Sequence, residues 1–347
     1  MKRNRKLLIV GGGVIHAYSL IELIKGYFDN IFLITDSEND KFRDIDHEVI
    51  NFSFSNPLNI IYSTVKVKKI IKEIKPDFII TMQIDTGAFC THLANNKNIP
   101  SMVVGFGSDV LIIPYKGFLY KFMANFILNR GKYFNTGSNY VAKGMNKLAN
   151  KDLGVVVSNF GIDDSIISNE KQNIVHSNRL HSSLYRIPLI IEAFARFIEK
   201  EERKDWKLVI AATGNEEALR TKTKELGIEK KVSFVGWLNK EENYYYYSIS
   251  KIWISIPKSD SIPISLLEAM AAGSIPIISD LPSIKDFFIN GENGIIVKNF
   301  DENYIEKALE LNFDDVSTQN VIKAKDFGSK EKNRTLFYSI FDNEFKS

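Results

Sequence analysis

The sequence predicts an α/β protein made of two parallel sheets with crossover helices. Strand-like and helix-like patterns alternate from one end of the chain to the other. The length of 347 residues suits two domains of ordinary size. A polar, non-periodic segment at 163–172 separates two alternating sets. We expect two Rossmann-like domains that face each other across a cleft, because α/β proteins bind ligands at the carboxyl ends of their strands.

The first alternating set supplies the first domain, expected over residues 1–165. Its expected strands lie at 6–10, 30–35, 48–52, 78–81, 101–104, 132–136 and 154–157. Its expected helices include 19–27, 60–74 and 88–95.

The second set supplies the second domain, expected over residues 166–325. Its expected strands lie at 173–176, 207–211, 232–235, 252–255, 275–278 and 294–297. Its expected helices lie at 187–197, 216–226, 240–250 and 264–272, and the chain closes with helix-prone segments at 302–311 and 318–341.

Composition limits the class of protein. The formal net charge is only +3, from 45 basic and 42 acidic residues, which argues against nucleic acid as a partner. The basic start leads into a short apolar run that ends in glycines, so it predicts a first strand rather than a signal peptide. The single cysteine, Cys90, allows no internal disulfide and suits a reducing cytoplasm. A buried position for Cys90 is favoured over a role as a nucleophile.

The most informative segment is 259–273, Ser-Asp-Ser-Ile-Pro-Ile-Ser-Leu-Leu-Glu-Ala-Met-Ala-Ala-Gly. It follows a predicted buried strand and opens a helix near Pro263. Unbonded amides at a helix start suit a phosphate or sugar oxygen. Asp260 precedes the helix, and Glu268 lies just over one turn inside it, where a carboxylate can accept two hydrogen bonds from vicinal hydroxyls. The competing interpretation is an amphipathic helix with two solvated acids.

This segment and the Ile-Pro-Ile-Ile-Ser after it resemble the paired-acid motif of the family 4 retaining glycosyltransferases, with Asp260 in place of the usual first Glu. The resemblance implies the GT-B fold, with residues 1–165 binding the acceptor and 166–325 binding a nucleotide diphosphate sugar. It also implies that a C-terminal helix over 326–347 packs on the first domain. Glu268 would bind the ribose and Asp260 the donor sugar. The loop contacts to the donor would come from Ser261, Ile262, Pro263 and Ile264.

Two segments, 177–180 and 187–194, resemble the family's strand–loop–helix in which an Arg and a Lys hold the diphosphate. Arg179 fits the Arg, and a guanidinium suits two phosphate oxygens. The Lys position falls on Tyr185, which departs from the family pattern. The neighbouring Arg186 either supplies the second positive charge or is a surface charge.

Two glycine-containing segments complete the expected donor contacts. Gly236 and Trp237 resemble the segment whose main chain touches the nucleotide base. Gly12 and Gly13, after the first strand, resemble the glycine loop that approaches the donor. A dinucleotide fingerprint would need a further glycine where His16 stands, which weakens an NAD-dependent reading. His16 either reaches the donor phosphates or has no role.

The acceptor side is expected in the segment 104–110, which resembles a loop where many family members carry a His-Gly pair. Phe106 takes the place of that His, so an imidazole base is excluded at this position. Retaining transfer by front-face departure of the diphosphate does not strictly require an enzymic base. Ser108 and Asp109 are the nearest polar candidates for an acceptor contact, and Asp109 could equally cap a helix.

Two further patterns have competing interpretations. Asp44 and Asp46 have the spacing of a metal-binding Asp-x-Asp, but a solvated turn is favoured, so we expect no metal and no cofactor beyond the co-substrate. The aromatic and basic run at 114–128, with lysines over 66–75, could form a surface that docks on anionic lipid. Packing of the apolar side of 114–128 in the core is the alternative.

The sequence therefore predicts a retaining hexosyltransferase that moves a sugar, with UDP favoured as the nucleotide, to a glycan or lipid-linked acceptor in cell-surface polysaccharide synthesis. It would act in the cytoplasm or at the inner face of the membrane. A nucleotide-sugar epimerase or hydrolase on the same fold is one alternative. Another is a non-catalytic nucleotide-sugar-binding partner that lost activity with the changes at Phe106 and Tyr185.

Overall fold

The structure is a computed structural model that describes residues 4–11, 14–54, 57–163 and 165–345. The chain divides into two compact units. Unit 1 comprises Met1–Gly161 and Lys330–Ser347, and unit 2 comprises Ile162–Ser329. The divisions therefore fall at 161/162 and 329/330, where the sequence analysis placed them at 165/166 and 325/326.

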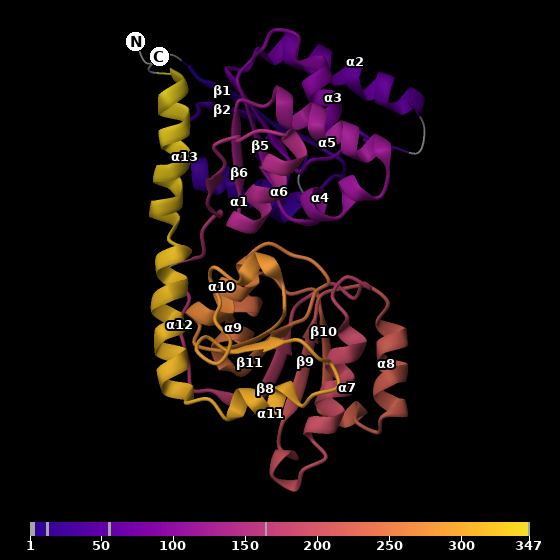
Figure 1. Ribbon diagram of the computed structural model, residues 1–347, viewed down its shortest axis with the longest axis vertical. Coiled ribbons are helices and arrows are strands. Elements are labelled where there is room, and N and C mark those ends of the chain that lie inside the picture. The colour runs from indigo at the N-terminus through magenta and orange to yellow at the C-terminus, as the bar shows by residue number, and fades with distance from the viewer. Residues whose placement is uncertain (1–3, 12–13, 55–56, 164, 346–347) are drawn as a thin grey trace. The chain divides into compact units, whose positions relative to one another are not determined.

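Unit 1 is built on a parallel seven-stranded sheet with the order β3-β2-β1-β4-β5-β6-β7. The strands are β1 (Lys6–Gly11), β2 (Asn30–Thr35), β3 (Asp46–Val49), β4 (Phe78–Met82), β5 (Ser101–Gly105), β6 (Tyr133–Thr136) and β7 (Val156–Val157). The helices are α1 (Val14–Ile24), α2 (Pro57–Ile74), α3 (Thr86–Ala94), α4 (Ser108–Leu111), α5 (Phe118–Arg130), α6 (Asn139–Ala149) and α13 (Lys330–Phe345). The central strands are continuous apolar runs because helices cover both faces of the sheet (Figure 1).

The C-terminal helix α13 packs on α1 of unit 1, as the fold class predicted (Figure 1). Phe341 is fully buried among aromatic rings that include Phe28 and Phe78. The hydroxyl of Tyr27 donates a 2.8 Å hydrogen bond to Asp342. The helix α13 therefore completes the hydrophobic core of the N-terminal sheet.

Unit 2 is built on a parallel six-stranded sheet with the order β10-β9-β8-β11-β12-β13. The strands are β8 (Gln172–Ser177), β9 (Lys207–Ala211), β10 (Val232–Gly236), β11 (Ser250–Ser255), β12 (Ile275–Ser279) and β13 (Ile295–Val297). The helices are α7 (Ile187–Phe197), α8 (Glu216–Glu225), α9 (Lys240–Ile249), α10 (Ile264–Ala271), α11 (Tyr304–Leu309) and α12 (Phe313–Phe327). Both sheets thus have the doubly wound order, which confirms the predicted fold class.

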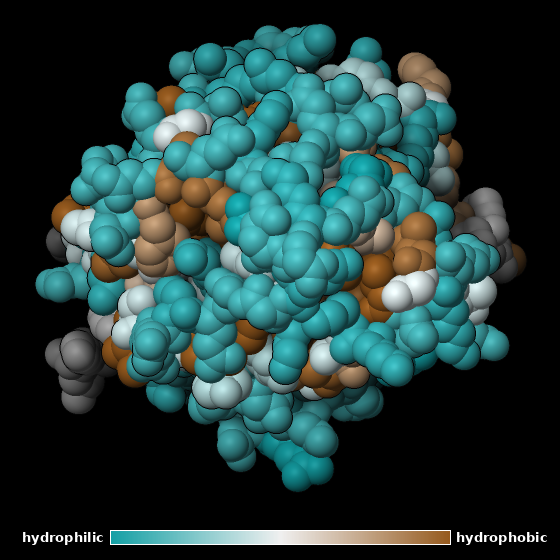
Figure 2. All heavy atoms as spheres, turned by 90° about the horizontal axis from the view of Figure 1, so that it is seen from below, coloured by the Kyte–Doolittle hydropathy of each residue, from teal (hydrophilic) through white to brown (hydrophobic). Residues whose placement is uncertain are grey.

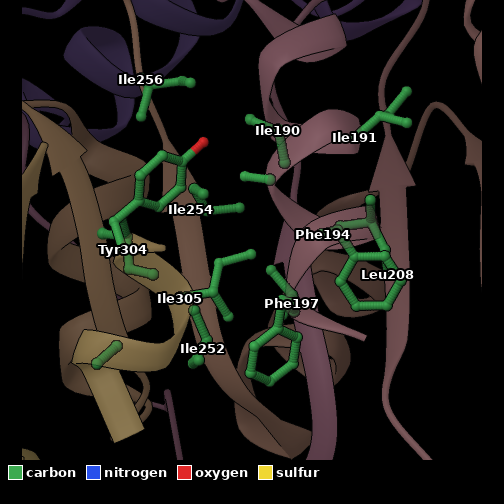
Figure 3. Packing of buried hydrophobic residues seen from close by; sticks show 14 of the residues in the cluster. Ile190, Ile191, Phe194, Phe197, Leu208, Ile252, Ile254, Ile256, Tyr304 and Ile305 are labelled. Atoms are coloured by element: carbon green, nitrogen blue, oxygen red, sulfur yellow. The ribbon is translucent and has the colours of Figure 1, made fainter. Parts of the chain in front are cut away.

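Figure 3 shows how one face of the unit 2 sheet is buried. Phe194 and Phe197 of α7 pack in the same cluster as Ile252 and Ile254 of β11. Tyr304 of α11 is also buried there, and its hydroxyl donates to a backbone carbonyl of α7 at 3.2 Å. This packing fixes α7, and hence the loop that precedes it, against the end of β11.

Several predicted element bounds were wrong by a few residues. The helix expected at 19–27 is α1, which starts directly after the glycines and ends at Ile24, before Gly26 with a φ of +90°. The strand expected at 48–52 ends at Val49. The helix-prone run at 318–341 is two helices, because α12 ends at Phe327 with Gly328 as its C-cap.

The order of strands reverses between β1 and β4 in unit 1 and between β8 and β11 in unit 2. Loops that follow the strands on either side of such a reversal splay apart and leave room for a ligand. Of the described residues, these loops carry 83–85 in unit 1, and 178–186 and 256–263 in unit 2. They contain most of the residues singled out from the sequence.

Among the described residues, no helix combines the length and the apolar character that crossing a bilayer requires. One face of the molecule, seen in Figure 2, is mostly hydrophilic, and its hydrophobic areas are small and separated.

Candidate active site

Polar groups of the loop itself and of Ser283 hold the loop before α10 in place. Pro263 is the N-cap of α10, with φ −67° and ψ 137°, and proline fixes this φ without needing an N–H donor. The backbone N–H of Ser261 donates to Asp260 Oδ1 at 2.9 Å. The hydroxyl of Ser283 donates to the carbonyl of Asp260 at 2.5 Å. The start of α10 is therefore preformed, with Asp260 at its entrance.

Arg179 brings the loop after β8 to this entrance. Its Nη2 donates to Asp260 Oδ2 at 2.6 Å, and its Nη1 donates to Ser265 Oγ at 2.7 Å. The side chains of Arg179 and Asp260 are 13% and 23% exposed. Burial raises the pKa of Asp260, and the charge of Arg179 opposes that rise. The structure thus places together two of the three side chains expected to act in catalysis.

Tyr185, which stands where the family has a Lys, contacts Arg179. The guanidinium carbon lies 4.3 Å from the centroid of the Tyr185 ring, a cation–π geometry. Arg186 has a φ of +53° and is the N-cap residue of α7. Its Nη1 donates to the carbonyls of Ile256 and Pro257 at 3.3 and 3.2 Å, so the side chain ties α7 to the end of β11. A role for Arg186 toward the diphosphate stays a prediction.

A chain of hydrogen bonds that starts in the core of unit 2 holds the Glu268 carboxylate. The buried Tyr247 donates from its hydroxyl to Glu268 Oε2 at 3.2 Å, and burial raises the pKa of Tyr247, so the hydroxyl keeps its proton. Asn178 Nδ2 donates to the Tyr247 oxygen at 2.6 Å. The indole of Trp253 donates to Asn178 Oδ1 at 3.0 Å. This chain runs from the core to the half-buried carboxylate and fixes its orientation.

The sequence analysis did not identify Tyr247, Asn178 or Trp253. Tyr247 belongs to the run of four tyrosines at 244–247, whose only sequence signal was repetition. Its partner Asn178 follows β8 directly and precedes Arg179. A polar residue at the end of the central strand β8 was the signal that could have pointed to this contact.

Close backbone contacts and hydrogen bonds hold the loops after β8, β9 and β10 in place. Gly214 has a φ of +147°, and a Cβ there would lie 2.6 Å from that of His181, so only glycine fits. The His181 N–H donates to the carbonyl of Thr213 at 2.9 Å. Gly236 ends β10 and its carbonyl accepts from Ala212 at 2.7 Å, while Trp237 is exposed. A contact of Gly236 and Trp237 with a nucleotide base stays a prediction.

In unit 1, Gly12 and Gly13 lie outside the described residues. The neighbouring Gly11 has a φ of +77°, and a Cβ there would lie 2.9 Å from the carbonyl of Met82, where β1 and β4 meet. His16 is exposed at the start of α1, and its ring centroid lies 4.5 Å from that of Phe106. Phe106, which replaces the family His, therefore packs against the imidazole of His16, with the two ring planes tilted by 31°.

Asp109 is not placed to meet an acceptor, contrary to one of its two interpretations. It is buried, and its carboxylate accepts from the backbone N–H groups of Ile84, Phe106 and Gly107 at 3.0, 3.0 and 2.7 Å. Through these bonds the Asp109 carboxylate joins the loops after β4 and β5. Its role is therefore structural and close to that of a helix cap. Ser108, by contrast, is exposed at the start of α4.

Asp85 is a candidate that the sequence analysis missed. It follows β4 and caps α3, with Oδ1 accepting from Ala88 N–H at 3.0 Å. Its Oδ2 lies 3.9 Å from where a Cβ on Gly11 would stand, so it faces the end of β1. Burial, with a smaller contribution from the charge of Asp109, raises the pKa of Asp85 to about 7. A carboxyl with this pKa can accept or donate a proton at neutral pH.

Cys90 and the pair Asp44 and Asp46 each had two interpretations from the sequence. Cys90 is buried, and burial raises its pKa, which favours a packing role over a nucleophile. Asp44 and Asp46 are exposed. In the part of the chain that the structure describes, no three His, Cys, Asp or Glu side chains are grouped to hold a metal ion. The expectation of no metal requirement stays a prediction.

Two family models match the chain. The model described as "Glycosyl transferases group 1" matches residues 160–333, which include Arg179, Asp260 and Glu268. The chain belongs to the glycosyl transferases group 1 family. A second model, "Glycosyl transferase 4-like", matches residues 7–138 of unit 1. This family membership confirms the resemblance drawn from the paired acids and makes the protein a transferase of glycosyl groups.

Curated relatives match shorter parts of this glycosyltransferase. An uncharacterized glycosyltransferase of Haemophilus influenzae is 32% identical over 110 residues, 31% of this chain and 30% of the relative. A GDP-mannose:cellobiosyl-diphosphopolyprenol alpha-mannosyltransferase of Xanthomonas oryzae is 26% identical over 140 residues, 40% of this chain and 35% of the relative. The matches thus span about a third of the length of each curated relative.

Solved structures share the fold over nearly the whole chain. HepE of Anabaena, determined with UDP and glucose, has a TM-score of 0.79 at 14% identity and covers 98% of this chain and 100% of its own. Sucrose-phosphate synthase of Thermosynechococcus elongatus has a TM-score of 0.78 at 13% identity and covers 99% of both chains. At these identities the likeness establishes the GT-B fold of this glycosyltransferase.

Proposed function

We propose that the protein is a retaining glycosyltransferase that moves a sugar from a nucleotide diphosphate donor to a saccharide or a lipid-linked saccharide. The observation that supports this proposal is the ion pair of Arg179 with Asp260 at the start of α10, with Glu268 just over one turn into the same helix. A cation, an acid and a recessed carboxylate at one helix start suit the three parts of a donor: diphosphate, sugar and ribose.

Each part of the donor has a proposed partner. Glu268, oriented by Tyr247, accepts hydrogen bonds from the two ribose hydroxyls. Arg179 binds the diphosphate, since a guanidinium has five N–H donors and its bonds to Ser265 and Asp260 use two of them. The positive end of α10 and the loop over 261–264 add favourable dipoles for the donor.

In the proposed reaction the bond from the anomeric carbon to the diphosphate oxygen breaks, and its electron pair leaves with the nucleoside diphosphate. The acceptor hydroxyl attacks the same face of the sugar, and its proton passes to the departing phosphate oxygen. Arg179 and the α10 amides stabilise the charge that develops on that oxygen. Asp260 contacts the sugar hydroxyls.

Unit 1 is the proposed acceptor unit. Ser108 is exposed and Asp85 half-buried at the carboxyl edge of its sheet. His16 lies at the start of α1, which follows β1, and we expect it to contact the donor phosphates together with Gly12 and Gly13, which lie outside the described residues. Asp85 replaces Asp109 as the proposed hydrogen-bond partner of the acceptor hydroxyl.

Names of relatives support a donor and acceptor class. The Anabaena structure contains UDP and glucose, and the Xanthomonas relative is named for GDP-mannose and a sugar on a diphosphopolyprenol. We favour a UDP-sugar, and a lipid-linked acceptor in cell-surface polysaccharide synthesis at the cytoplasmic side of the membrane. No metal or other cofactor enters the proposed chemistry.

The test is a thermal-shift panel of UDP, GDP, ADP and their sugars, followed by transfer with the sugar that binds. A ligand at about one hundred times its dissociation constant adds about 2.7 kcal/mol of stability, so the correct nucleotide stands out. Nuclear magnetic resonance of the product should show the anomeric configuration of the donor. An inverted product would refute the retaining mechanism. Free epimerised sugar nucleotide formed without acceptor would instead indicate an epimerase.

A further inference from the structure

Large apolar side chains are exposed on two helices of unit 1. They belong to the first half of α2, the start of α5 and the turn before α5. We call this set the apolar surface: Leu58, Ile61, Tyr62, Val65, Tyr115, Phe118, Leu119 and Phe122. Leu58 is 70% and Phe118 86% exposed. Apolar side chains that gather in this way mark an interaction site more often than a chance exposure.

The exposed apolar side chains of α2 lie on a different face of the helix from the side chains that pack in the core. Residues 58, 61, 62 and 65 recur at helical spacing on one face, while Ser63, Val67, Ile70 and Ile71 are buried on the other. The exposed face continues toward the end of the helix as Lys68 and Lys72. In α5 the buried side likewise consists of other residues, namely Met123, Ala124, Ile127 and Leu128. Each helix therefore has a complete core face and, in addition, an apolar outer face.

The two helices lie on the same side of the sheet. Both α2 and α5 contact α3, which lies on the sheet face opposite α1 and α13 (Figure 1). The rings of Phe54, in the loop before α2, and Tyr120 of α5 lie 5.4 Å apart between centroids. The apolar surface is therefore shared by neighbouring segments and is not two separate patches.

This surface lies at the carboxyl edge of the unit 1 sheet. Lys6 Nζ donates to the carbonyl of Ile74 at 3.3 Å, so α2 ends beside the first residue of β1. The N–H of Lys132, just after α5, donates to Ser101 at the start of β5 at 3.0 Å. Both helices thus end at the amino edge, and their first halves lie at the opposite edge, which also carries Asp85.

The two chain segments that carry the apolar surface are basic, although Glu48 of β3 pairs with Lys66 at 2.7 Å. Between Glu48 and Glu73 the sequence has four lysines and no acid. Between Asp109 and Asp152 it has seven basic residues and no acid. The whole chain has a net charge of only +3, so positive charge is concentrated in these two segments. Lys116 and Lys121 are exposed beside the apolar side chains of α5.

We propose that the apolar surface docks unit 1 on a membrane that contains anionic lipid. The apolar side chains enter the headgroup region, and the lysines bind lipid phosphates. A protein partner would need acidic residues placed to match these lysines. Binding to an anionic bilayer requires only that this protein expose apolar area and positive charge. Docking in this way would present the carboxyl edge of unit 1 to an acceptor carried by lipid. That statement about the acceptor rests on the proposed function, whereas membrane docking itself does not.

The test is co-sedimentation of the full chain with vesicles of phosphatidylcholine alone and of phosphatidylcholine with phosphatidylglycerol. We expect binding to the anionic vesicles that weakens as salt is raised. Ile61→Ser combined with Phe118→Ser should lower the partition constant about tenfold or more, because both side chains lose their apolar burial in lipid. The double variant Lys68→Glu/Lys72→Glu should lower the partition constant at least fivefold for each lysine replaced.

Controls separate docking from folding and from catalysis. Ile322→Ser, at an exposed apolar position of unit 2, should bind vesicles as the unchanged chain does. The variants should keep the nucleotide-induced thermal shift and transfer to a soluble saccharide. No binding to anionic vesicles, or equal binding by the Ile61 and Phe118 variant, would overturn the proposal. Self-association that the variant abolishes, without vesicle binding, would also overturn it and indicate a second copy as the occupant.

Discussion

Arg179 and Asp260, 81 residues apart in the sequence, form an ion pair of 2.6 Å between the loop after β8 and the start of α10. Both side chains are largely buried, so the loss of one would leave the other without a counter-charge in a poorly solvated position. The ring of Tyr185 and the hydroxyl of Ser265 hold the same guanidinium. Arg179 is therefore oriented before any ligand arrives.

Arg179→Lys should impair the enzyme although it keeps the charge. An ammonium cannot reproduce the planar contacts to Ser265, Asp260 and the diphosphate together. Loss of one charge-assisted bond costs about 1.5–3 kcal/mol, so we expect kcat/KM for the donor to fall between about tenfold and a hundredfold. Steady-state kinetics with varied donor measure this. Arg220→Lys, on the exposed surface of α8, is the matched control, and equal values for the two variants would contradict the role of Arg179.

Tyr247→Phe should destabilise unit 2 and weaken donor binding together. The change removes the hydroxyl that donates to Glu268 and leaves the amide of Asn178 without its 2.6 Å acceptor. We expect a loss of about 1–3 kcal/mol in the free energy of unfolding, measured with urea, and a higher KM for the donor. Tyr245→Phe, at an exposed neighbouring position, should change neither quantity. An unchanged donor KM in Tyr247→Phe would show that Glu268 needs no such support.

Asp85→Asn should change how stability depends on pH. Because the pKa of Asp85 is raised from 3.8 to about 7, the folded state keeps a proton that the unfolded chain releases between these values. This contribution is full below about pH 4 and is lost as the pH rises to about 7. Asparagine also caps helices and does not titrate. The stability of Asp85→Asn relative to the unchanged protein should therefore increase from pH 4 to pH 8.

Denaturant unfolding across that pH range checks this prediction. Asp44→Asn, at an exposed position, is the control and should show no such trend. A stability difference for Asp85→Asn that stays constant with pH would mean that folding does not raise the pKa of Asp85.

Phe341→Ala should destabilise unit 1, although only six residues follow Phe341 in the sequence. Its ring is fully buried between Phe28 and Phe78, so truncation leaves a cavity that costs about 3–5 kcal/mol. Urea unfolding followed by circular dichroism measures the loss. Leu336→Ala, at an exposed site on the same helix, should cost far less. Similar losses for both would indicate that α13 is not part of the core.

The sequence predicted the architecture well because parallel strands buried on both faces are continuous apolar runs, as in β1 and β4. It also predicted that Arg179 and Asp260 serve one site, through family spacing. It could not predict Tyr247 or Asn178, because their role depends on which side chains meet beneath α10. The two interpretations of Asp109 stayed open for a related reason: a carboxylate in a loop can face either solvent or backbone amides, and only tertiary packing decides between them.

The most direct test of the central claim is isothermal titration of the donor nucleotide into the unchanged chain, Glu268→Ala and the control Glu225→Ala on exposed α8. Loss of the ribose contacts should weaken binding by one to two orders of magnitude in Glu268→Ala, since a charge-assisted hydrogen bond is worth about 1.5–3 kcal/mol. Glu225→Ala should bind as the unchanged chain does. Equal affinity in all three proteins would contradict the assignment of the donor site to the start of α10.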